Sequence, residues 1–139
     1  MEKTKKYELK PMIYSIKSTC EILAHDTYCG YEFCIINRGT HPCAYVRIPF
    51  DDILYHYKDS ILDNIMKCHG GITWDKNYVN GLSKKNRNND RWLGWDYVCL
   101  RDYYSRDNLL IKWRTEEILE EIKEVIDRLR EYENNLLKW

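Results

Sequence analysis

Two apolar segments that alternate with period two, separated by a turn, constrain the fold of this chain more than any other feature. Between Gly30 and Asn37, the side chains of Tyr31, Phe33 and Ile35 would share one face of a strand, and the residues between them would share the other. The next five residues, 38–42, include a glycine and a proline and predict a turn. A second strand is expected at 43–48, so the two segments predict an antiparallel β-hairpin.

A long amphipathic helix is predicted near the C-terminus. Thr115 is a natural N-cap, and the two glutamates after it lie where the helix dipole favours negative charge. The helix would run to about Asn134 and carry one apolar stripe, made of Ile118, Ile122, Val125, Ile126, Leu129 and Tyr132. The chain is expected to be a single domain, residues 1–139, with an α+β fold: a mostly antiparallel β-sheet packed by one long C-terminal α-helix.

The segments between the hairpin and this helix have shorter patterns. Residues 51–65 carry apolar positions three and four apart, which predicts a helical turn or two packed on the sheet. Residues 66–74 are interpreted as strand, bend and strand, and residues 75–90 as a polar loop. Residues 91–100 are rich in aromatic and β-branched side chains and predict another strand. Before the hairpin, residues 12–23 fit either a strand or a short helix.

Charge balance and hydropathy disfavour several classes of protein. The 22 basic and 22 acidic side chains give a formal net charge of zero, which argues against a duplex nucleic-acid binder. No segment approaches the ~20 apolar residues of a membrane span. Residues 1–10 are charged and lack the apolar core of a signal peptide. We therefore expect a cytoplasmic protein without a membrane or duplex nucleic-acid partner.

The six cysteines raise the question of disulfides, metal sites and nucleophiles. Thiols are expected in a cytoplasmic protein, and the lack of a C-x-x-C pair disfavours structural zinc. Asp96, Cys99 and Asp102 are spaced three apart, which one strand does not place on one face, so no metal site is expected. Cys99 with His69 as its base would need a third, orienting group that the sequence does not identify. We expect no cofactor and no catalysis, and a hydrolase-like activity of Cys99 and His69 is the enzymatic alternative.

Two short segments concentrate the residues that could bind a ligand: His-Gly-Gly-Ile-Thr-Trp at 69–74 and Arg-Trp-Leu-Gly-Trp-Asp at 91–96. A glycine pair permits positive φ, and its N–H groups could face an anion, while tryptophans offer flat faces to a base. The structural alternatives are a β-bulge at the glycine pair and core positions for the tryptophans. Arginines could bind phosphate in a bidentate manner. The candidate ligand-binding residues are Arg47, His69, Gly70, Gly71, Thr73, Trp92, Trp95, Asp96 and Asp102.

The order of these motifs resembles that of a family of small uncharacterised phage and prophage proteins. The family's pattern is Tyr-Val-x-x-Pro, then His-Gly-Gly-Leu-Thr, then Trp-x-Gly-Phe-Asp-x-x-His-x-Gly-Asp, followed by a C-terminal helix. This chain has Tyr-Val-Arg-Ile-Pro at 45–49, His-Gly-Gly-Ile-Thr at 69–73 and Trp-Leu-Gly-Trp-Asp at 92–96. The similarity spans residues 43–102, with the helix beyond. Cys99 stands where the family has its second histidine, and Arg101 where it has glycine, so a site or specificity built on those residues would be altered here.

This resemblance implies a phage or prophage origin, and small phage accessory proteins often antagonise host defence. The function expected on this basis is a binding protein in an infected or lysogenic bacterial host. It would sequester a nucleotide-derived immune signal, a cyclic nucleotide or an ADP-ribose derivative, without turnover. The alternative is a protein–protein inhibitor of a host defence effector, such as a CRISPR nuclease, that uses residues 75–90 and the aromatic surface. A homodimer or higher homo-oligomer is also expected, because one helix covers one sheet face and the C-terminal Leu136, Leu137 and Trp139 are apolar.

Overall fold

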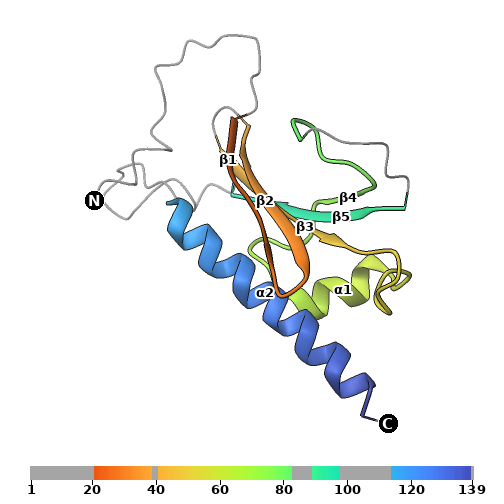
Figure 1. Ribbon diagram of the computed structural model, residues 1–139. Coiled ribbons are helices and arrows are strands. Elements are labelled where there is room, and N and C mark those ends of the chain that lie inside the picture. Colours follow the sequence, from red (N-terminus) through yellow and green to blue (C-terminus); the bar gives the residue numbers. More distant parts are fainter. Residues whose placement is uncertain (1–20, 39–40, 83–88, 98–113, 139) are drawn as a thin grey trace, which may run out of the picture.

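The computed structural model describes residues 21–38, 41–82, 89–97 and 114–138, and it shows the predicted α+β fold. These residues form a five-stranded antiparallel sheet in the order β1-β2-β3-β5-β4, with both helices on one face (Figure 1). The elements are β1 (Glu21–Tyr28), β2 (Tyr31–Asn37), β3 (Pro42–Ile48), α1 (Asp59–Met66), β4 (Trp74–Lys76), β5 (Arg91–Asp96) and α2 (Thr115–Leu136).

The predicted hairpin is confirmed as β2 and β3. Phe33 pairs with Val46, and Asn37 pairs with Pro42 at the turn. The period of two sorts the side chains of β2 as expected: those of Tyr31, Phe33 and Ile35 pack toward the helices, and those of Cys34 and Ile36 pack on the other face. We call the helix-covered side the first face of the sheet and the other side the second face.

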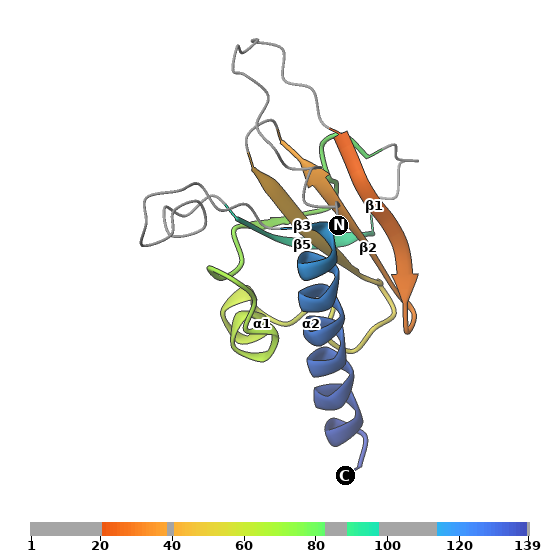
Figure 2. The same ribbon diagram turned by 90° about the vertical axis from the view of Figure 1, so that its left-hand side faces the viewer.

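The helix α2 crosses the first face, with α1 beside it (Figure 2). Its predicted stripe is confirmed, since Ile118, Ile122, Val125, Ile126 and Leu129 are buried and Tyr132 is half-buried. The predicted N-cap was wrong by one residue. Arg114 is the N-cap, its backbone N–H donates to Glu117 Oε1 at 3.0 Å, and Thr115 is the first helical residue, because the glutamate three positions after Arg114 supplies the acceptor.

The prediction of strand, bend and strand for residues 66–74 was wrong in its first part. Leu62 and Met66 lie four residues apart and are both buried, so α1 continues through Met66. Lys67 then ends the helix in the left-handed conformation, with φ of 50°, and its N–H donates to the carbonyl of Asp63 at 3.0 Å. A strand appears only from Trp74.

The edge strand β1 pairs with β2 through a two-residue turn. Cys29 and Gly30 both have positive φ, 51° and 86°, as a type I′ hairpin requires. Residues 12–23 could not be assigned from sequence, and their described part, 21–23, is the start of this strand. The side chains of β1 are exposed or half-buried, so the strand lacks the apolar alternation that identifies β2 and β3.

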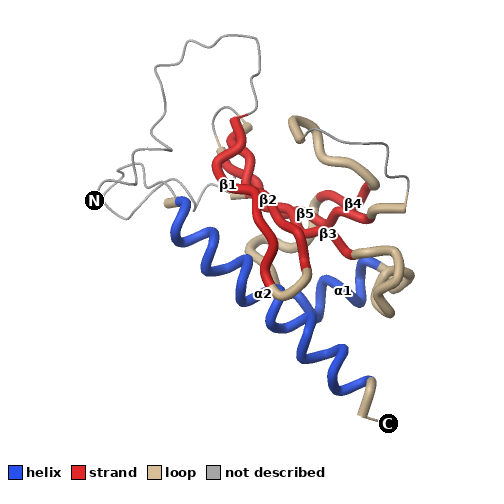
Figure 3. The backbone as a smooth tube through the Cα atoms, viewed as in Figure 1, coloured by secondary structure: helices blue, strands red, loops and turns tan. Residues whose placement is uncertain are grey.

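The segment after β4 covers part of the second face. Val79 and Leu82 pack against Cys34, Ile36 and Trp92. Figure 3 shows the backbone of this segment, the tan tube that follows β4, on the side of the sheet away from the helices. Residues 75–90 were predicted to be a polar loop, but β4 includes residues up to 76 and Val79 is buried. From the sequence, a second copy of the chain was expected to cover this face. The segment after β4 instead covers part of it. Within the described residues, neither helix is long and apolar enough to cross a membrane.

Two polar clusters tie loops to this framework. The hydroxyl of Tyr31 lies 2.8 Å from Asp52 Oδ2 and 2.6 Å from Glu133 Oε2, linking β2, the loop after β3 and the last turns of α2. Arg91, at the start of β5, donates through Nη1 to the backbone carbonyls of Tyr55 (2.7 Å) and Tyr57 (2.6 Å).

The same guanidinium also forms a bidentate pair with Asp75 on β4. Arg91 Nε and Nη2 donate to the two carboxylate oxygens at 3.0 and 2.9 Å. Four hydrogen bonds from one planar group therefore join β4, β5 and the loop at 55–57.

Candidate functional site

A pocket of about 310 Å³ opens on the second face of the sheet. The hairpin and its turn contribute Arg38, His41, Cys43 and Tyr45 to its lining. The strands β4 and β5 and the residue before β4 contribute Thr73, Trp74, Trp95 and Asp96. The pocket thus lies between two parts of the sheet that are distant in sequence.

Tyr45 forms the floor because its partner strand leaves room for it. Tyr45 pairs with Gly94 across β3 and β5, and a Cβ on Gly94 would lie 2.5 Å from Tyr45 Cδ2. The ring therefore lies directly over the glycine backbone. Trp74 stands beside it, with ring centroids 6.1 Å apart and ring planes at 86°. Tyr45 is only 3% exposed, so Trp74, which is half-buried, is the member of this pair that a ligand could contact over a larger area.

Arg38 is fixed against Tyr45. Its Nε and Nη2 atoms both donate to the Tyr45 hydroxyl oxygen, at 3.1 and 2.7 Å. The guanidinium carbon is also 5.3 Å from the ring centroid, but the two hydrogen bonds define its position better than a cation–π contact does. These hydrogen bonds help to hold the cation at this side of the pocket.

Asp96 supplies the opposite charge. It is half-buried at the end of β5, where it pairs with Cys43. Thr73 Oγ1 donates to Asp96 Oδ2 at 3.2 Å, and the Thr73 backbone N–H donates to the carbonyl of Gly94 at 2.8 Å. The threonine thereby orients the carboxylate from a backbone that is itself hydrogen-bonded to β5.

The remaining titratable groups leave this charge pattern unchanged near neutral pH. Burial lowers the pKa of His41, Arg38 lowers it further, and Asp96 opposes them, so the imidazole is neutral at pH 7. Burial raises the pKa of the Cys43 thiol to about 11, so this sulfur is protonated. The pocket therefore combines one positive group, Arg38, with one negative group, Asp96.

Three of the predicted site residues line this pocket: Thr73, Trp95 and Asp96. The role of Trp95 is mainly structural. Its ring belongs to the core of the first face, and its Nε1 donates to the Tyr97 hydroxyl at 2.9 Å. Asp102, together with Cys99 of the enzymatic alternative, lies outside the described residues.

His69 is near the pocket in sequence but not among its lining residues. Its ring stacks on Tyr97, with centroids 4.8 Å apart and planes at 11°, and its backbone N–H donates to Glu121 Oε2 at 2.7 Å. The Tyr97 hydroxyl donates to the other oxygen of Glu121. This network joins the loop after α1 to β5 and α2, which is a structural role.

The glycine pair closes that loop. Gly70 and Gly71 have positive φ, 74° and 85°, as their sequence suggested. The Gly71 N–H donates to the carbonyl of Cys68 at 3.0 Å, and the next N–H, of Ile72, donates to Asp63 Oδ1 at 3.0 Å. These N–H groups bind the chain's own acceptors, so the geometry favours a tight turn over a cradle for an anion.

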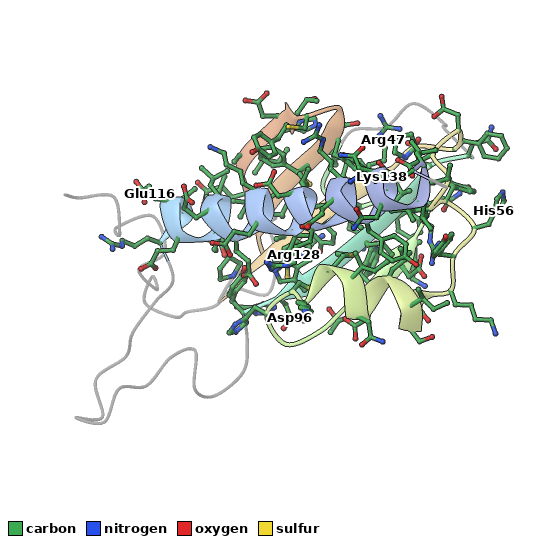
Figure 4. All side chains as sticks on the ribbon, turned by 90° about the horizontal axis from the view of Figure 1, so that it is seen from below. Arg47, His56, Asp96, Glu116, Arg128 and Lys138 are labelled. Carbon is green, nitrogen blue, oxygen red and sulfur yellow. The ribbon has the colours of Figure 1, made fainter. Side chains whose placement is uncertain are left out.

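Arg47 and Trp92 lie at the other end of the second face. They pair with each other across β3 and β5, four residues along each strand from the pair of Cys43 and Asp96. Figure 4 shows Arg47 well separated from Asp96. Trp92 is buried under the segment that follows β4, so it is a core residue.

Arg47 belongs to an ion-pair network that excludes it from a ligand role in this pocket. Its Nε donates to Glu32 Oε1 at 2.8 Å, and its Nη1 lies 3.3 Å from Asp90 Oδ1. His25 Nε2 lies 2.7 Å from the other oxygen of Glu32. Burial alone would raise the pKa of Glu32, but the hydrogen bonds from His25 and Arg47 outweigh it and lower that pKa.

Sequence reasoning missed Arg38, His41 and Tyr45 as site residues and left Trp74 out of the final set. One signal could have indicated Tyr45: a glycine inside an apolar strand marks a close approach by a neighbouring group, and Gly94 is such a glycine. Arg38 and His41 lie in the hairpin turn, where a polar residue has no distinguishing pattern.

No protein-family model, curated protein or solved structure matches this chain. Among the residues that the structure describes, no three His, Cys, Asp or Glu side chains lie close enough together to hold a metal ion.

Proposed function

We propose that this protein binds and sequesters a nucleotide-derived immune signal, such as a cyclic nucleotide or an ADP-ribose derivative, without turning it over. The observation that carries the proposal is the pocket on the second face, where aromatic rings, a cation and a carboxylate converge. Convergent polar groups in an apolar hollow are typical of small-molecule sites. A phage or prophage origin, implied by the resemblance of the motifs, supplies the biological setting.

The size of the pocket fits one nucleoside. Small-molecule sites range from about 300 to 1,000 Å³, and this pocket has about 310 Å³. It would enclose one base and part of its sugar, while the phosphates and any second nucleoside would extend beyond it. Trp74 would contact the base, and the charged side chains of Arg38 and Asp96 would lie beside it in the pocket lining.

Sequestration is favoured over turnover by the chemistry of the lining groups. Nucleophilic cysteine requires a thiolate, and the thiol of Cys43 has a pKa of about 11. His41 is neutral and could act as a base, but the adjacent thiol is held protonated by burial rather than activated. The lining groups therefore suit binding more than covalent catalysis.

Isothermal titration of the protein with cyclic oligonucleotides, ADP-ribose derivatives and mononucleotides tests this proposal. We expect at least one of them to bind, and we expect Trp74→Ala to weaken that binding by about 10-fold or more, because stacking on a base contributes ~1–3 kcal/mol. His56→Ala changes an exposed ring outside the pocket and is the control. Failure of every member of the panel to bind would overturn the proposal, and recovery of a cleaved ligand would overturn the absence of turnover.

A protein–protein inhibitor of a host defence effector is the second candidate function. Three large apolar side chains are unusually exposed on the segment from the end of β3 to α1: Phe50 (54%), Ile53 (45%) and Ile61 (42%). Tyr55 and His56 pack edge-to-face with Phe50, at centroid distances of 5.1 and 6.1 Å. Exposed aromatic clusters of this kind favour protein interfaces.

Pull-down from a host lysate distinguishes the two functions. The inhibitor function predicts a stoichiometric protein partner that is lost in Phe50→Ser and retained in Trp74→Ala. The binding function predicts a small molecule released from the purified protein on heating. A partner that survives Phe50→Ser would remove this segment as the contact.

A homo-oligomer also remains a proposal. Leu137 is 71% exposed at the end of α2, and with the apolar segment near α1 it offers surface for a second copy. Light scattering at micromolar concentration tests it, because a protein that stays monomeric on concentration would contradict it.

A further inference from the structure

We propose that a groove between α1 and α2 binds an extended peptide of a partner protein, one that carries an acidic side chain and, two residues away, an apolar one. The groove has a volume of about 420 Å³ and is lined by side chains of both helices and of the residue after α1. It opens to solvent, because the lining residues Asn64, Glu131 and Asn135 are exposed. This second site is separate from the pocket on the second face, and the proposal does not rest on nucleotide binding.

The two helices run in opposite directions along the groove, which gives it two different ends. At one end, Arg128 Nε on α2 donates to the carbonyl of Met66, the last residue of α1, at 3.0 Å. At the other end, the Tyr132 ring meets the ring of Tyr57, just before α1, with centroids 6.1 Å apart and planes at 88°. Figure 4 looks onto this side of the molecule, with Arg128 between the two helices.

The first end is cationic. Lys67 and Arg128 both line the groove there, and no carboxylate of the described residues forms an ion pair with either of them. The bond from Nε to Met66 holds the Arg128 guanidinium in place, and its two Nη groups remain as donors. A guanidinium beside an ammonium is the complement of a carboxylate, so charge complementarity favours an acidic side chain at this end.

The second end is apolar. Ile61 and Ile65 lie four residues apart on α1 and therefore on one side of that helix. Ile61 is 42% exposed, and Tyr132 stands half-buried on the opposite wall. An apolar side chain inserted between these walls would remove the exposed part of Ile61 from water, which favours binding.

The spacing of the two ends fits an extended peptide. Ile61 and Lys67 lie six positions apart, about 9 Å along a helix. In an extended chain, side chains two residues apart point to the same side and lie about 7 Å apart. The long side chain of Lys67 spans the remaining distance.

The polar groups in the middle of the groove also favour this occupant. Asn64 and Asn135 lie on opposite walls, and neither makes a hydrogen bond within the part of the chain that the structure describes. Each amide can donate to a carbonyl and accept from an N–H, the groups that an extended backbone presents and a helical one does not. Glu131, one turn after Arg128, disfavours a second acidic side chain here.

The test selects a random heptapeptide library, displayed on phage, against the immobilised full-length protein. We expect enrichment of peptides in which an acidic residue lies two positions from a large apolar residue. In a selected peptide, replacing the acidic residue by serine should weaken binding by about 5-fold or more, because it removes contacts with two cations. A library without binders, or binders that lack either residue, would overturn the proposal.

The variant Lys67→Glu gives a gain of binding that loss of structure cannot imitate. Lys67 is exposed, and its replacement should make the library yield lysine or arginine where the wild type selects an acid. Lys76→Glu, at the exposed end of β4, is the matched control and should select the same acidic peptides as the wild type. Selection of acidic peptides by Lys67→Glu, or a changed selection by Lys76→Glu, would contradict the assignment.

The affinity of a selected peptide, measured by fluorescence polarisation, distinguishes the groove from the exposed segment after β3. Affinity should fall by about 5-fold or more in Lys67→Glu and stay unchanged in Phe50→Ser. A loss in Phe50→Ser alone would place the peptide on that segment and overturn the groove as its site. The nucleotide titrations test the other pocket, so their failure would leave these outcomes unaffected.

Discussion

The ring of Tyr45 lies over Gly94, its partner across β3 and β5, at a distance that admits no side chain on the glycine. A Cβ there would approach Tyr45 Cδ2 to 2.5 Å and the carbonyl oxygen of Ala44 to 3.0 Å. The floor of the pocket and the position of Arg38, which binds the Tyr45 hydroxyl, both depend on this approach.

Gly94→Ala is expected to displace Tyr45 and to lower the free energy of unfolding by about 1–3 kcal/mol, the usual cost of overpacking. The free energy of ligand binding should fall by more than the free energy of unfolding, because a displaced Tyr45 would also displace Arg38, which binds its hydroxyl. Chemical denaturation and titration measure the two effects. Gly30→Ala is the control: its φ of 86° strains an alanine, but nothing lies within 4 Å of its Cβ and the pocket is distant. Equal loss of affinity in both variants would contradict the role of the approach.

The cluster of Tyr31, Asp52 and Glu133 predicts a dependence of stability on pH. The Tyr31 hydroxyl has one proton but two carboxyl neighbours, so one carboxyl must itself be protonated to complete both hydrogen bonds. Burial and the hydrogen bond to Asp52 raise the pKa of Glu133 to about 7, against the opposing effects of Tyr31 and Arg130. The folded state therefore holds this proton more tightly than the unfolded state.

Because the folded pKa is raised, the contribution of Glu133 to stability is fully present below its unfolded pKa of about 4.5 and is lost as pH rises to about 7. Urea unfolding across this interval should show wild type losing stability relative to Glu133→Gln as pH rises. Glu131→Gln, at an exposed position on the same helix, should follow the wild-type profile. A constant difference between wild type and Glu133→Gln across the interval would contradict this assignment.

Arg91→Lys is expected to destabilise the protein by about 1–3 kcal/mol, because an ammonium cannot reproduce a planar group that binds two carbonyls and a carboxylate at once. Hydrogen exchange should also become faster at residues 55–57, whose carbonyls Arg91 binds. Arg114→Lys changes an exposed pair with Glu117 and should cost less than about 1 kcal/mol. Unaltered exchange at 55–57 would show that the loop holds its position without Arg91.

Cysteine reactivity should follow burial among the described thiols. Burial raises the pKa of Cys34 and Cys68 to about 12 and that of Cys43 to about 11, whereas Cys29 is exposed in the turn between β1 and β2. Mass spectrometry after brief alkylation of the native protein should find Cys29 modified first. Early modification of Cys43 would indicate an activated thiol and revive an enzymatic function.

Periodicity predicted the elements that bury one face, and it failed at β1 and at the end of α1 for two different reasons. The alternation in β2 and β3 and the stripe of α2 are direct consequences of packing on the first face. The strand β1 carries exposed side chains, so its position depends on hydrogen bonds to β2 that leave no mark on the sequence. Met66 was predicted to begin a strand. Its spacing of four from Leu62 is helical, but this spacing identifies a helix only if α1 is known to continue through Met66.

The candidate site was predicted in part, for a similar reason. Thr73 and Asp96 belong to motifs that sequence reasoning had selected, and the fold brings them to the pocket. His69 and the glycine pair were predicted to contact a ligand, but the glycine pair forms a tight turn and His69 stacks on Tyr97. Arg38 and Tyr45 reach the pocket through strand register, which depends on long-range pairing.

The pocket's two walls come from the hairpin and from β4 with β5, so neither wall forms a binding site by itself. The site is absent from an unfolded or partly folded chain. A ligand of this pocket would therefore bind the folded state and not the unfolded state. Occupancy would then add RT ln(1 + [L]/Kd) to the free energy of unfolding, about 2.7 kcal/mol at a hundredfold excess over Kd. The thermal midpoint of the protein would thus report how much of such a ligand is present.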